Sequence, residues 1–165
     1  MENKLKEFAE LYFEGVNEFI GVQGIEVLKF FGKQIDKGFE MPLDLSVLEF
    51  LTGQINATFI NKLEEYPVVM VIDDESEDDE IIGMTNDMLE IIGLNATFQE
   101  NINKLNPSEY LIQISKDLLK YDFRIIRFNI EGMIPFGIVK KDNIDKIVEL
   151  YNSFSDEDGF KACAL

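Results

Sequence analysis

The chain of 165 residues has 32 acidic and 15 basic side chains, and its net charge of −17 at pH 7 would repel nucleic acid and anionic membrane surfaces. It has no histidine and one cysteine, Cys163, which excludes an internal disulfide, a Cys₂His₂ zinc site and His-dependent nucleophiles within one chain. No apolar run reaches the ~20 residues of a membrane span, and the N-terminus lacks the apolar core of a secretion signal. We therefore expect a cytoplasmic protein that holds no cofactor.

The N-terminal part predicts two amphipathic helices in succession. Apolar residues recur at helical spacing over residues 4–20. After a break at Gly21, a second apolar stripe runs on to Gly38, which stands where a left-handed C-terminal cap is wanted.

A third helix and a buried strand follow. Ser46 and Glu49 have the spacing of a capping box, which predicts a helix over about 46–65 that Pro67 ends. Residues 68–72 are all apolar, without the alternation of a half-exposed strand, and this favours a strand covered on both faces.

Seven of the eight residues in 73–80 are Asp or Glu. We interpret them as a hydrated loop at the tip of a hairpin, because residues 81–84 have the composition of a short return strand. Thr85 or Asn86 then caps a short helix that ends at Gly93.

The C-terminal part predicts a helix, a hairpin and a last helix. Asn106-Pro107 is a strong helix start, with Asn as the cap, and this helix runs to about Tyr121. Residues 123–140 have the pattern of strand, turn and strand. A helix over 143–154 follows, and 155–165 is expected to be an acidic C-terminal tail.

These elements predict the α+β class: three N-terminal amphipathic helices, then two β-hairpins forming one sheet, with the intervening and C-terminal helices packed on it. Residues 1–154 are expected to form a single domain, since a chain of this length buries roughly 70% of the surface of its unfolded form. The element order is similar to that of some ligand-binding domains, including the four-vinyl reductase family and its trafficking relatives. The paired cysteines expected near the end of that family are absent.

The acidic segment is the first candidate site. Residues 68–75 resemble the opening of receiver domains of two-component signalling, in which paired acids after a strand hold Mg²⁺. That resemblance implies a phosphorylated Asp after a later strand, but Asn129 stands at the nearest counterpart, so we reject the family. A calcium loop that starts at Asp73 would need Gly where Asp78 stands. We therefore predict no metal site here.

Arginine offers the second candidate. Arg124 and Arg127 are the only two arginines, and strand alternation places them on opposite faces. An arginine under the helices must pair with an acid such as Glu131 or with an anionic ligand. Arg127, Phe128 and Phe136 are thus our candidate ligand-binding residues, with the two rings enclosing an apolar pocket or else filling the core.

The leading functional hypothesis is a non-enzymatic binding or regulatory module for a small apolar ligand or a protein partner, which includes a homodimer. One alternative is a divalent-cation-dependent hydrolase or phosphotransferase that uses Asp73, Asp74 and a nearby Glu, with Lys140 as a phosphate contact. The other alternative is an assembly subunit of a larger complex. No catalytic residue is identified.

Overall fold

The computed structural model describes residues 1–16, 18–38, 43–52, 68–98, 105–154 and 160–165. Its elements, in chain order, are α1 (Glu2–Tyr12), α2 (Glu18–Asp36), α3 (Leu43–Leu51), β1 (Met70–Ile72), α4 (Asp78–Ile91), α5 (Pro107–Leu118), a 3₁₀ turn (Leu119–Tyr121), β2 (Phe123–Asn129), β3 (Ile134–Lys140), α6 (Ile144–Asn152) and β4 (Lys161–Ala164). No helix in these ranges is both long and apolar enough to cross a bilayer.

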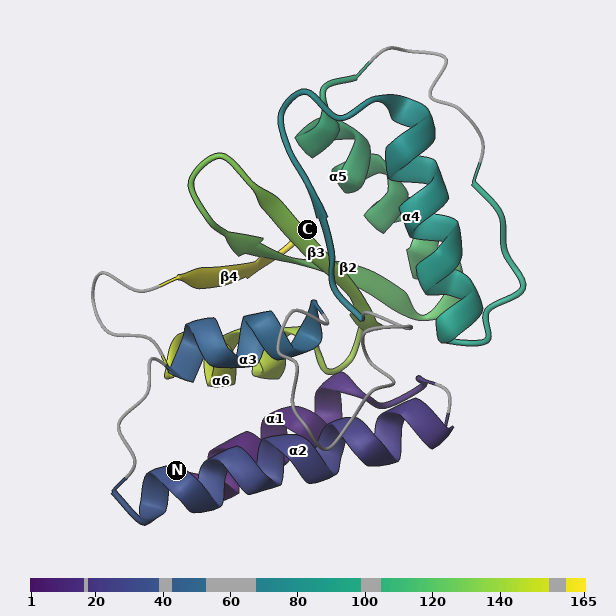
Figure 1. Ribbon diagram of the computed structural model, residues 1–165. Helices are drawn as coiled ribbons and strands as arrows, with labels where there is room; N and C mark the ends of the chain where they lie inside the picture. Colours follow the sequence, from purple (N-terminus) through teal and green to yellow (C-terminus); the bar gives the residue numbers. More distant parts are fainter. Residues whose placement is uncertain (17, 39–42, 53–67, 99–104, 155–159) are drawn as a thin grey trace.

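Helices cover both faces of a four-stranded antiparallel sheet with the strand order β1-β3-β2-β4. Figure 1 shows α4 and α5 on one side of the sheet and α1, α2, α3 and α6 on the other. The predicted α+β class is confirmed, and so is the hairpin of β2 and β3, in which Arg127 lies opposite Phe136.

The break between the first two helices comes earlier than predicted. α1 ends at Tyr12 and α2 begins at Glu18, and Gly15 takes the left-handed φ of +86° that the turn requires. Gly21 therefore lies inside α2. The prediction for Gly38 is confirmed, since it has a φ of +88° and donates its N–H to the oxygen of Ile35 at 2.8 Å.

The third helix begins at Leu43, three residues before the predicted start. Ser46 is a buried residue within α3, so it does not cap the helix, and the predicted capping box is wrong. The rest of the predicted helix, from 53 to 65, lies outside the described residues.

The acidic segment continues into a helix and not into a hairpin. α4 begins at Asp78, where acidic residues in the first turn complement the helix dipole. Residues 81–84, the predicted return strand, belong to this helix, and β1 pairs with β3 instead. Thr85 is not a cap, because its hydroxyl donates to the oxygen of Ile81 one turn earlier at 2.7 Å.

The predicted helix end at Gly93 and the predicted helix start at Asn106 are both confirmed. Gly93 terminates α4 with a φ of +69° and donates its N–H to the oxygen of Glu90 at 2.9 Å. At the start of α5, Asn106 Oδ1 accepts from the N–H of Glu109 at 2.9 Å, and the Glu109 carboxylate accepts from the N–H of Asn106 at 3.3 Å.

Part of the expected tail is a strand. Residues 161–164 form β4 alongside β2, and Leu165 continues this pairing by donating its N–H to the oxygen of Ile125 at 2.9 Å. Ala162 is 5% exposed, so this short segment covers sheet edge and core that water would otherwise reach. Residues 155–159 lie outside the described part of the chain.

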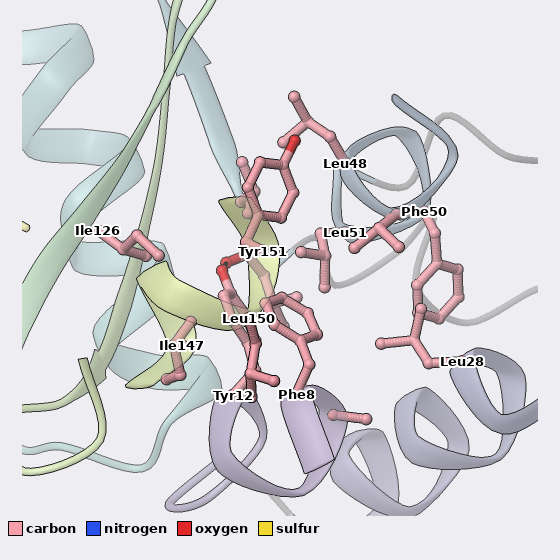
Figure 2. Packing of buried hydrophobic residues seen from close by; sticks show 14 of the residues in the cluster. Phe8, Tyr12, Leu28, Leu48, Phe50, Leu51, Ile126, Ile147, Leu150 and Tyr151 are labelled. Atoms are coloured by element: carbon pink, nitrogen blue, oxygen red, sulfur yellow. Dashed lines mark hydrogen bonds between the residues drawn. The ribbon is translucent and has the colours of Figure 1, made fainter. Parts of the chain in front are cut away.

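Two tyrosine hydroxyls donate hydrogen bonds to backbone oxygens within one of the two cores. The Tyr12 hydroxyl donates to the oxygen of Val68 at 3.1 Å, and the Tyr151 hydroxyl donates to the oxygen of Asp44 at 3.1 Å. Figure 2 shows these rings with Phe8 among the packed side chains, and Phe8 and Tyr12 stack at 5.4 Å between centroids. Burial raises the pKa of both phenols well above the usual value.

Gly137 of β3 is the position that admits the Tyr12 hydroxyl. A methyl group at residue 137 would overlap that hydroxyl and would lie 3.2 Å from the Val68 oxygen. We predict that Gly137→Ala lowers the free energy of unfolding by about 1 to 3 kcal/mol, and that Tyr12→Phe in the same chain recovers part of the loss. Urea unfolding measures both.

Gly83→Ala is the matched control, because residue 83 is exposed in the middle of α4 and nothing approaches it within 4 Å. There the free energy of unfolding should rise by about 0.5 to 1 kcal/mol. A Gly137→Ala variant as stable as wild type would contradict the close approach.

The buried phenols also predict a loss of stability in alkali. A phenol whose pKa is raised by folding contributes stability that is complete below its usual pKa of 10.0 and is lost as the pH rises above it. Each such tyrosine lowers the free energy of unfolding by up to about 1.4 kcal/mol per pH unit. Urea titrations on both sides of that pH should show a shallower decline for Tyr12→Phe, and parallel curves would refute the assignment.

Candidate functional site

Arg127 lies on the face of β2 that α5 covers. Its side chain is half-buried, and its Nη1 donates to the Ser108 hydroxyl in the first turn of α5 at 3.1 Å. Its Nε is shielded from solvent and has no acceptor. Among the described residues it forms no ion pair, so the expected pairing with Glu131 is not found.

Arg124 has a structural role. Its Nε and Nη2 both donate to the backbone oxygen of Leu165, at 3.1 and 2.9 Å. Ser115 of α5 donates to the same oxygen at 2.6 Å and accepts the N–H of Ile125 at 3.0 Å. Arg124 therefore ties residue 165 to β2 and helps to close the sheet edge.

The three predicted binding residues do not meet in one place. Phe136 lies opposite Arg127 across the β2–β3 pair and belongs to the core under α4 and α5. Phe128 belongs to the core on the other face, where its ring meets that of Tyr151 edge-on at 4.8 Å. Both phenylalanines are 0% exposed, so each fills a core.

A small cavity lies elsewhere, at a place that sequence reasoning missed because its lining comes from distant parts of the chain. It measures about 10 Å³, which is room for a single water molecule and not for an organic ligand. The side chains that line it are apolar and belong to Val16, Val68, Met88, Ile91, Ile92 and Ile138.

The carboxylates after β1 serve their own loop. Asp73 Oδ1 accepts from the N–H of Glu75 at 2.8 Å and from the Ser76 hydroxyl at 3.3 Å, and Asp73 and Asp74 are exposed. Within the described ranges no three acidic or Cys side chains are grouped to hold a metal ion.

Lys140 is far from these carboxylates. Ile72, just before Asp73, pairs with Ile134 at one end of β3, whereas Lys140 is the last residue at the other end, about 20 Å away. The Lys140 ammonium lies over the Phe123 ring, 4.0 Å from its centroid. The structure therefore does not place Lys140 near Asp73 and Asp74, as the hydrolase alternative requires.

The acids of residues 73–90 lie on the loop 73–77 and on α4, and we call this loop and the outer side of α4 the acidic surface. Residues 73–90 contain nine Asp or Glu and no Lys or Arg. Asp79, Asp87 and Glu90 are exposed on the helix. None of these nine acids is in an ion pair with a described residue. This surface was not predicted from the sequence, because a strand was expected for residues 81–84, which belong to α4.

Comparisons of the chain with protein-family models, with curated proteins and with solved structures find no match. Function is therefore inferred from the geometry around Arg127 and from the acidic surface.

Because no three described carboxylates are grouped to hold a metal ion, we predict that divalent cations do not stabilise the fold. A cation that binds only the native state must raise the midpoint of thermal unfolding. With millimolar Mg²⁺ or Mn²⁺, and NaCl matching the ionic strength in the control, we expect the same midpoint. A rise in the wild type that disappears when Asp73 and Asp74 are both changed to Asn would contradict this prediction.

Proposed function

We propose that the chain is a non-catalytic binding module whose acidic surface docks a positively charged region of a protein partner. The observation that carries the proposal is the uncompensated charge of residues 73–90, where nine acids stand without a base. Complementary charge speeds the encounter of two proteins and selects among partners.

α4 presents this charge on a firmly packed element. Ile81, Met88 and Leu89 of its inner side are at most 2% exposed and belong to the core against the sheet. Asp79 and Asp87 are two turns apart on the outer side, and exposed Gly83 lies between them without a side chain. A partner helix or loop can therefore come close to the α4 backbone while its Lys or Arg side chains reach the carboxylates.

The described part of the interior offers less support for a small apolar ligand. The apolar cavity of about 10 Å³ admits no organic molecule. Phe128 and Phe136 are both 0% exposed and belong to different cores. A surface interaction needs neither of them to move.

A second copy of this chain is a poor occupant of the acidic surface. A two-fold dimer joins the same patch of both subunits, so it would bring acids against acids. Like charges that face each other across an interface cost several kcal/mol by order of magnitude. We therefore assign the surface to a different, basic protein, which also accommodates the role of an assembly subunit.

The test uses a fluorescent peptide rich in Lys and Arg and measures its binding by anisotropy. We expect binding at low salt that weakens as salt rises. The triple change Asp79→Lys, Asp87→Lys and Glu90→Lys should abolish it, because attraction at the docking surface becomes repulsion.

The matched control reverses exposed acids on α1, α2 and α6, namely Glu7→Lys, Glu26→Lys and Asp145→Lys. It changes the net charge of the protein by the same amount, and we expect it to weaken binding only slightly. Equal loss in the two triple variants would mean unspecific attraction and would overturn the proposal. Absence of binding by the wild type at low salt would overturn it as well.

A further inference from the structure

From the surroundings of Arg127 we infer that the Arg127 guanidinium and the Ser108 hydroxyl bind a small oxyanion, a phosphate or carboxylate group of a ligand. This site involves β2 and α5 and none of the acids of the acidic surface. The inference does not rest on the proposed docking of a basic partner.

Hydrogen-bond capacity at Arg127 is the first argument. A guanidinium has five N–H donors and no acceptor. In the described structure one of these donors is used, by Nη1 toward Ser108, while Nε is closed off from solvent without an acceptor. Because the Ser108 oxygen accepts from Arg127, its own proton remains available to a further acceptor. Donors thus exceed acceptors here, and an oxyanion that enters beside the half-buried Arg127 side chain would supply an acceptor.

Charge is the second argument. The chain has 32 acids, yet no described carboxylate pairs with this half-buried guanidinium, although Lys6, Lys29, Lys141 and Lys146 all have such partners. Arg124 on the same strand satisfies two of its N–H groups on Leu165. A half-buried charge without a counter-charge is unfavourable, and an anion bound to Arg127 would compensate it.

Chemistry narrows the class of ligand. The planar fork of arginine matches two oxygens of one carboxylate or phosphate, and a chloride ion cannot use that geometry.

Cys163 of β4 lies directly opposite Arg127 on one side, and Phe136 of β3 lies opposite it on the other. The only thiol of the chain is therefore a neighbour of the proposed site.

The experiment measures phosphate and acetate binding by calorimetry, at constant ionic strength set with chloride. Wild type should bind at least one of the two oxyanions. We expect Arg127→Gln to weaken binding by about tenfold or more and Ser108→Ala to weaken it less. Lys116→Gln removes one positive charge from the exposed side of α5 and should bind like the wild type.

A second readout locates the anion. Alkylation of Cys163 by neutral iodoacetamide, followed by mass spectrometry, should slow when the oxyanion is added to wild type and should not change in Arg127→Gln. Circular dichroism establishes that each variant is folded. Should Arg127→Gln not fold, Arg127→Lys, which keeps the charge and loses the fork, takes its place and is expected to bind several-fold more weakly.

Three results would overturn the inference. The first is that neither phosphate nor acetate binds the wild type. The second is that the Arg127 variant retains wild-type affinity. The third is that Lys116→Gln weakens binding as much as the Arg127 variant does, since only net charge would then matter.

Discussion

The contact on which the architecture depends is the hydroxyl of Tyr12 above Gly137. It connects α1 to Val68, two residues before β1, by donating to the Val68 oxygen, and it needs a strand residue without a side chain beneath it. Its ring is 1% exposed. Tyr151 makes the corresponding connection from α6 to α3. Two phenols thus satisfy buried backbone oxygens, and Tyr12 also limits how closely α1 approaches β3.

The two faces of the sheet differ in what they carry. The face toward α1 and α6 packs aromatic rings, Phe128 among them, whereas the face toward α4 and α5 contains Arg127 and supports the acidic surface. The two regions have opposite charge but lie on different parts of this layer, and no described ion pair joins them. The proposed oxyanion site and the proposed docking surface therefore share no residue.

Some local signals were readable from the sequence, but the predicted caps at Ser46 and Thr85 were wrong, and long-range pairing was not readable. The left-handed cap at Gly38 and the N-cap at Asn106 depend on a few neighbouring residues, and both are found. Residues 81–84 are too few to separate strand from helix by periodicity, and no local pattern shows that β1 pairs with β3. Strand alternation predicted that only one of the two arginines lies under a helix, without saying which, and it is Arg127 that contacts α5. Phe128 was grouped with it, although neighbouring strand residues point to opposite faces.

The sheet ends in two very short strands, β1 with three residues and β4 with four. Short edges offer another chain little to pair with, and this restrains edge-to-edge aggregation. The apolar run that contains β1 would be the weak point, since uncharged segments of this kind stack readily during folding. Asp73 and Asp74 follow it at once and can act as gatekeepers, whose repulsion keeps growing stacks of identical chains apart.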